Sequence, residues 1–204
     1  MGIEQLDVPY LMAPGNHDSS GTVEALRTIP NVIILENGQK FTQNGLTITG
    51  KADPVFSPDN GLSKESEKSE EKQLGRDMQG ILDEQAANIV VLHNPTAGNE
   101  VKTGADLVIS GHTHKFKFRE GNPDEPLRIT AGTSGGAGLR MFDNPYGVET
   151  QQDFSILNFS SSCRLISIDQ ISVTSVSGPP NLRIKHIPVS NSKISTVDQT
   201  QSCQ

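Results

Sequence analysis

The chain has 204 residues, with 33% hydrophobic residues, 19 Gly and 12 Pro, which suits a single domain with many turns. Its formal net charge of -7 argues against a nucleic-acid-binding surface, because such a surface needs clustered Lys and Arg. No stretch approaches the roughly 20 apolar residues that span a bilayer, and the N-terminus lacks the basic and apolar regions of a signal peptide. The sequence leaves the compartment open.

The N-terminal segment predicts a strand, a turn and a short helix. Residues 7–13 favour a strand that leads into Gly15-Asn16-His17-Asp18, which consists largely of turn-forming residues. Residues 19–29 have the composition of a helix, and Ser19 or Ser20 is a suitable N-cap for it.

Three apolar segments follow, at residues 31–35, 39–43 and 46–52. They are separated by the pairs Asn37-Gly38 and Asn44-Gly45. Because Asn-Gly pairs favour the positive φ angles of tight hairpin turns, we expect an antiparallel three-stranded meander.

The middle of the chain predicts a long loop and then a helix. Residues 53–67 are rich in Pro, Asp, Asn, Gly and Ser, as in a loop. The charged run at 63–72 is typical of a solvated helix start rather than a binding patch. Beyond it, apolar residues at helical spacing predict a core-facing stripe, formed by Leu74, Met78, Ile81 and Leu82.

The second half of the chain predicts mostly strands. Two continuous apolar runs, at 88–92 and 105–110, have the length of buried strands, and each is followed by histidine. A further strand is expected at 127–133, and late antiparallel strands at 154–160, 164–173 and 182–189. We expect one domain over residues 1–189 and a polar, disordered tail over 190–204.

The two cysteines, Cys163 and Cys203, have neither the spacing of a metal site nor that of a disulfide framework. We expect Cys163 to be a small buried apolar residue and Cys203 a free thiol in the tail.

Four of the five histidines follow strand-like segments: His17, His93, His112 and His114. In open α/β sheets, ligand sites are built from the loops beyond the carboxyl ends of the strands. A lone histidine there is usually structural, but four at equivalent positions indicate a site. The fifth, His186, lies inside a strand-like segment and is expected to be structural.

His112 and His114 are two positions apart, so their side chains would point to opposite faces of a strand. In a tight turn permitted by Gly111, the two rings can diverge toward two neighbouring metals. Imidazole suits zinc, iron or manganese, and the amide oxygen of Asn16 is a harder ligand for similar ions. Two such ions can hold a phosphate ester and generate a hydroxide nucleophile.

The three motifs together resemble those of the calcineurin-like metallophosphoesterases. Gly15-Asn16-His17-Asp18, His93-Asn94-Pro95 and Gly111-His112-Thr113-His114 occur in the order and approximate spacing of that superfamily, and the resemblance covers residues 7 to about 188. It implies an α/β fold, a β-sandwich flanked by helices in αββα layers. It also implies hydrolysis of phosphate mono- or diesters with two divalent metal ions, such as Mn, Fe or Zn.

By position, the resemblance assigns Asn16, His93 and His112 to one metal and His114 to the other. His17 would stabilise the transition state or protonate the leaving oxygen, and Asp18 would orient His17. Arg140, in a Gly-rich stretch, is a candidate contact for the phosphate of a small phosphoester substrate.

The sequence departs from the family pattern at its N-terminus. Family members carry Asp-x-His and Gly-Asp-x-x-Asp motifs ahead of the Gly-Asn-His motif, and this chain contains neither. We therefore expect an incomplete fold without its first strand-helix units, and little or no hydrolysis by the chain alone. Some bacterial members carry membrane-spanning helices ahead of the catalytic domain, so the complete protein is a candidate for an N-terminal membrane region.

Two alternatives to an enzyme stay open. In one, a degenerate phosphoesterase fold serves as a non-catalytic binding or assembly module. In the other, the chain is a plain metal-binding protein that holds one ion. Cap loops choose the substrate in this superfamily, and the loop at 53–67 is the expected local contributor.

Overall fold

The structure is a computed structural model that describes residues 2–55, 63–122, 124–134, 150–175, 181–190 and 202–203. Its centre is a six-stranded sheet in the order β3-β4-β5-β6-β8-β7, in which the four inner strands run parallel and the two edge strands antiparallel. The strands are β3 (Asn37–Gln43), β4 (Leu46–Lys51), β5 (Ala87–Leu92), β6 (Ala105–Ser110), β7 (Lys117–Arg119) and β8 (Leu127–Thr130). The buried strands after residue 87 are confirmed, whereas β7 was not foreseen.

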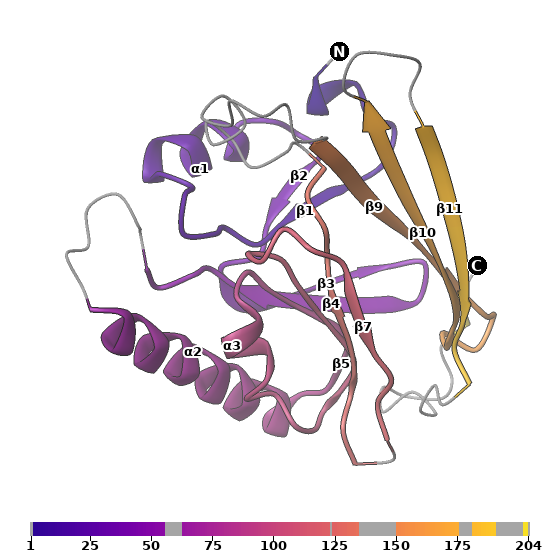
Figure 1. Cartoon of the computed structure of the whole chain (residues 1–204). Helices are drawn as coiled ribbons and strands as arrows, with labels where there is room; N and C mark the ends of the chain where they lie inside the picture. Colours follow the sequence, from indigo (N-terminus) through magenta and orange to yellow (C-terminus); the bar gives the residue numbers. More distant parts are fainter. Residues whose placement is uncertain are drawn as a thin grey trace.

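Helices cover one face of this sheet and a second sheet covers the other (Figure 1). The helices are α2 (Lys64–Glu84) and α3 (Pro95–Gly98), which pack on the sheet through an apolar cluster that includes Met78 and Val90. The second sheet is antiparallel, in the order β11-β10-β9, with bounds β9 (Thr150–Phe159), β10 (Leu165–Ser175) and β11 (Asn181–Pro188). The result is a mixed α/β fold with packed sheets flanked by helices, as expected.

Helix α2 follows the rules that its sequence suggested. Ser63 is its N-cap, and the side-chain oxygen accepts a hydrogen bond from the backbone N–H of Ser66 at 3.2 Å. Leu74, Met78 and Leu82 are buried against the sheet, and Ile81 packs beside them. No helix in the described part of the chain is long and apolar enough to cross a bilayer.

The N-terminal region forms a small unit of its own, with the 3₁₀ turn η1 (Ile3–Gln5), β1 (Tyr10–Met12), α1 (Ser20–Arg27) and β2 (Val32–Ile34). Ser19 caps α1 by accepting from Thr22 N–H. Strand β2 pairs in parallel with β1, so the predicted three-stranded meander is wrong. Of the three segments in the predicted meander, β3 and β4 form a hairpin, through the Asn44-Gly45 turn at positive φ, whereas Gly38 lies within β3.

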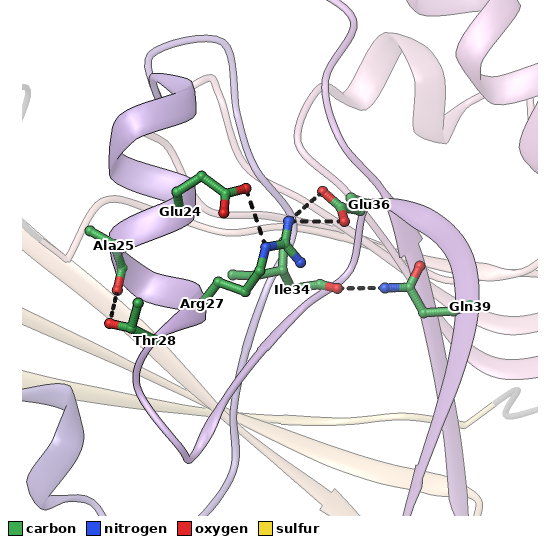
Figure 2. A network of polar contacts seen from close by, with 7 residues as sticks. All are labelled: Glu24, Ala25, Arg27, Thr28, Ile34, Glu36 and Gln39. Carbon is green, nitrogen blue, oxygen red and sulfur yellow. Dashed lines mark hydrogen bonds and ion pairs between the residues drawn. The ribbon is translucent and has the colours of Figure 1, made fainter.

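Polar contacts join this unit to the central sheet (Figure 2). The Arg27 guanidinium donates to both carboxylate oxygens of Glu36 at 3.0 Å, which ties α1 to the segment before β3. The Gln39 amide donates to the carbonyl oxygen of Ile34 at 2.6 Å. Together these contacts orient β1, and with it the turn that follows.

A disulfide joins Cys163 to Cys203, with Cα atoms 5.1 Å apart and a sequence separation of 40. The expectation of a free Cys203 thiol is therefore wrong. Cys203 N–H also donates to Ser161 at 2.9 Å, which fixes the last described residues against the turn before β10. The predicted disordered tail at 190–204 lies, apart from residues 190, 202 and 203, outside the described residues.

Candidate metal centre

The turn after β1 is buried at Gly15 and Asn16 and is internally hydrogen bonded. Gly15 N–H donates to the Asp18 carboxylate at 2.8 Å, and Asp18 N–H donates back to the Gly15 carbonyl at 3.0 Å. Asp53 N–H, beyond β4, donates to the carbonyl of Pro14 at 2.9 Å. These bonds hold Asn16 in a fixed position, where it is 7% exposed.

Three predicted ligands converge at this turn. Oδ1 of Asn16 lies 2.9 Å from Nε2 of His93, and Nδ1 of His112 lies 3.3 Å from the same Nε2. The two imidazole rings meet edge to face, at an interplanar angle of 84°. Two donors bound at about 2.0–2.2 Å to one ion lie about 2.8–3.6 Å apart at octahedral or tetrahedral angles. The observed separations therefore fit a shared divalent ion.

The strand ends explain why these side chains meet. His93 directly follows β5 and His112 follows β6, and these strands are parallel neighbours in the sheet. Gly111 N–H donates to the His93 carbonyl at 2.8 Å, which joins the two loops. On the other side of the ring, a Cβ on Gly15 would lie 2.5 Å from Nδ1 of His93, so only glycine lets the turn approach this closely.

The turn that carries His112 and His114 is built differently from the expectation. His112 has a φ of 64° and His114 a φ of 57°, so the histidines themselves adopt the left-handed conformation that was expected of Gly111. Non-glycine residues pay a conformational penalty in this region, and such residues cluster at functional sites.

The other predicted site residues differ in their placement. His17 is exposed and Asp18 half-buried, and the charges of both act on His93. His114 is exposed and, within the described part of the chain, makes no hydrogen bond or ion pair with the other candidates. Arg140 lies outside the described residues.

Burial lowers the pKa of His93 below its ordinary value of 6.5. The nearby carboxylates of Asp53 and Asp18 oppose this shift, whereas His112 and His17 reinforce it. The lowered pKa keeps the imidazole neutral near pH 7, and neutral imidazole is the form that binds metals.

Two acidic residues beside the site were missed or misread in the sequence. Asp53 follows β4, which is parallel to β5, so its position at the sheet edge that carries His93 was a usable signal. Glu71 belongs to the charged run that was expected to be solvated, yet it is 3% exposed. Its helical spacing to Leu74 and Met78 places it on the buried face of α2. The solvated interpretation of the run is therefore wrong at this residue.

A pocket of about 290 Å³ opens between α2 and the site. Asn16 and His112 line it from the metal side, and Glu71 lines it from α2. Two further α2 residues in its lining, Lys64 and Lys68, are exposed cations. The pocket thus combines potential metal ligands with groups that attract anions.

The donor set of Asn16, His93 and His112 suits a divalent transition metal. This donor set needs the Asn16 amide oxygen as one of its ligands. In the residues that the structure describes, no three His, Cys, Asp or Glu side chains are placed to hold a metal together.

The sequence of the chain matches the family model of the calcineurin-like phosphoesterases over residues 1–116, more than half of its length. The chain therefore belongs to this family, whose members generally bind divalent metals. No curated protein sequence matches it.

Several solved structures resemble the fold at low identity. Vacuolar protein sorting 29 (Vps29) from Cryptosporidium parvum is 18% identical, with 91% of this chain and 86% of that chain covered and a TM-score of 0.39. Wild-type Vps29 from Entamoeba histolytica, complexed with Zn²⁺, is 16% identical, with 88% and 82% covered and a TM-score of 0.36. A Staphylococcus aureus protein assigned as a 5'-nucleotidase is 15% identical, with 94% and 40% covered and a TM-score of 0.37. We draw no conclusion on function from these likenesses.

Proposed function

We propose that the protein is a metal-dependent phosphoesterase that hydrolyses phosphate mono- or diesters. The observation that carries the proposal is the convergence of the Asn16, His93 and His112 donor atoms, 2.9 and 3.3 Å apart, at a pocket that exposed lysines also line. Family membership supports the same chemistry.

In this proposal, Asn16, His93 and His112 hold one divalent ion. A divalent ion held there would supply Lewis-acid chemistry toward a phosphate ester. The chain's own residues then bind and orient the substrate around it. Lys64 and Lys68 attract the phosphate from the rim of the pocket, and Arg140 is a further candidate for this role.

His17 is the proposed acid or transition-state contact. It is exposed and adjacent in the sequence to Asn16, which lines the pocket, while Asp18 anchors the turn through Gly15 N–H. In the two-metal form of the mechanism, His114 is a ligand of the second ion. Because the sequence has no Asp-x-His or Gly-Asp-x-x-Asp motif, we expect slow turnover by this chain alone.

The test is metal-dependent hydrolysis of chromogenic phosphate mono- and diesters by the purified chain, with and without Mn²⁺. We expect activity that EDTA abolishes, Mn²⁺ restores and His93→Ala removes. His186→Ala is the matched control, since His186 lies on β11 beside Asp169. Activity that persists in His93→Ala would exclude the proposal.

A second candidate is a non-catalytic binding or assembly module. The observation that favours it is the lack of a three-residue His, Cys, Asp or Glu metal cluster among the described residues. If this candidate is correct, the protein hydrolyses neither ester at any metal concentration, whether or not the Asn16–His93–His112 site binds an ion. The hydrolysis assay therefore separates the two candidates.

A further inference from the structure

Two carboxyl groups meet beside the candidate metal centre without a cation of their own. Asp53 lies in the segment after β4, and Glu71 faces inward from α2. Oδ2 of Asp53 and Oε2 of Glu71 are buried and, among the described residues, have no hydrogen-bond partner. Oδ1 of Asp53 is anchored, since it accepts from Val55 N–H at 2.9 Å.

This arrangement is unfavourable unless something positive lies between the two carboxyls. A buried carboxylate without a partner destabilises the fold, and a second carboxylate nearby adds repulsion. Burial first, and then the charge of the nearby Asp53, raise the pKa of Glu71 to about 8. Either a proton shared by the pair or a bound cation relieves the repulsion.

The surroundings favour a cation over a proton alone. Glu71 lines the same pocket as Asn16 and His112, so its side chain borders a space that also borders the candidate metal centre. The acceptors offered are oxygens, and Glu67 adds another acidic residue to the lining. The lysines of the pocket, Lys64 and Lys68, are exposed. Their side chains are long enough for the ammonium groups to lie in solvent rather than against the two carboxyls.

We propose that Asp53 and Glu71 form a binding site for a hard divalent cation of the Mg²⁺ or Mn²⁺ type, next to the Asn16–His93–His112 centre. Carboxylate oxygens are the preferred ligands of such ions, whereas the imidazoles of the neighbouring centre suit softer ones. The catalytic value of this second ion rests on the proposed function, but its binding does not. The two acidic ligands are not part of the motifs that place the chain in its family.

The test counts Mn²⁺ ions bound to the full chain at pH 8, by the loss of the free-ion signal in electron paramagnetic resonance. We expect two ions in the unaltered protein, one in Glu71→Gln and one in His93→Ala. Asp53→Asn removes the charge of the other carboxyl of the pair and should also bind one ion. Far-UV circular dichroism verifies that each variant is folded. Glu65→Gln, an exposed position on the same helix, is the control and should bind two.

The outcomes separate this inference from the proposed function. If Glu71→Gln and Asp53→Asn are folded and bind as many ions as the unaltered protein, with affinities within about threefold of it, the pair holds only a proton and the inference is wrong. If one ion binds and only His93→Ala removes it, the inference is again wrong and the proposed metal centre stands. If one ion binds and only the acidic-pair variants remove it, the inference stands and the proposed centre fails.

Discussion

Nε2 of His93 lies 2.9 Å from Oδ1 of Asn16, although 77 positions separate the two residues in the sequence. The contact joins the turn after β1 to the end of β5, and His112 approaches the same nitrogen from the end of β6. Three chain segments thus present one donor atom each to a common point. The metal chemistry proposed for the protein depends on this point.

Removing His93 should weaken metal binding. His93→Ala deletes the ligand that contacts both other donors, so we expect the affinity for Zn²⁺ or Mn²⁺ to fall by about 10–100-fold or more. Isothermal titration calorimetry measures the change. An affinity equal to that of the His186→Ala control would contradict the assignment.

His17→Ala should reduce turnover far more than metal content. His17 is exposed and supplies no donor to the Asn16–His93 contact, so the bound ion should be retained. General acid catalysis contributes about 10²–10⁴-fold, and we expect a loss of that order in the metal-loaded protein. Metal analysis and the rate with a chromogenic phosphoester are measured on the same sample. An unchanged rate would remove His17 from the mechanism.

A single methyl group at Gly15 should disturb the site. In Gly15→Ala the new Cβ would lie 2.5 Å from Nδ1 of His93, so either the ring or the turn must move. We expect a loss of about 1–3 kcal/mol in the free energy of unfolding, with weaker metal binding. The matched change is Gly80→Ala on α2, where nothing lies within 4 Å and helix propensity predicts a gain of about 0.5–1 kcal/mol. Urea denaturation compares the two, and equal effects would show that the close contact is not real.

The raised pKa of Glu71 predicts a pH dependence of stability in metal-free protein. Glu71 binds a proton more tightly in the folded chain, with a pKa of about 8 against an ordinary 4.5. The stabilisation of the folded state that results from this tighter proton binding is therefore fully present below about pH 4.5 and is lost as the pH rises toward about 8. The groups responsible besides burial are Asp53 and Glu67.

The comparison with Glu71→Gln isolates this contribution from other titrating groups. In EDTA, the unaltered protein should lose stability relative to Glu71→Gln as the pH rises from 5 to 8.5, as measured by the free energy of unfolding. Urea denaturation at a series of pH values measures it. A constant difference over this range would show that Glu71 is not held beside Asp53.

The disulfide should stabilise the fold measurably. The Cys163–Cys203 bond closes a loop whose ends have a sequence separation of 40, for which about 2–4 kcal/mol is typical. Cys203→Ser should lower the free energy of unfolding by this amount, and reduction of the unaltered protein should have the same effect. Thiol labelling under denaturing, non-reducing conditions provides the check: two labelled cysteines would show that the bond is absent.

The parts of the structure that local patterns determine were predictable. The caps at Ser19 and Ser63, the Asn44-Gly45 hairpin and the buried strands follow from residue type and spacing over a few positions. The meeting of His93 and His112 follows from their places after parallel neighbouring strands, β5 and β6. Asn16 follows β1, in a separate two-stranded sheet, and only the family resemblance grouped it with the two histidines.

The remaining features depend on partners that are distant in the sequence. Strand β2 has three residues, and its apolar pattern is the same whether it pairs with β1 in parallel or with β3 in a hairpin. Gly38 uses its positive φ within β3, at an irregularity in the pairing with β4, rather than in a turn.

Glu71 shows the same limit at the site itself. A charged run on a helix is usually solvated, but Glu71 shares the buried face of α2 with Leu74 and Met78. Asp53 belongs to the segment at 53–67 for which the sequence predicts a loop. Its place at the end of a strand parallel to β5 was the signal for it.

The most direct test of the metal centre is an anomalous difference map from crystals of the full chain grown with Mn²⁺ or Zn²⁺. We expect a peak within about 2.0–2.3 Å of Asn16 Oδ1, His93 Nε2 and His112 Nδ1 at once. A map with no peak at this position, at an ion concentration that saturates binding in solution, would contradict this expectation.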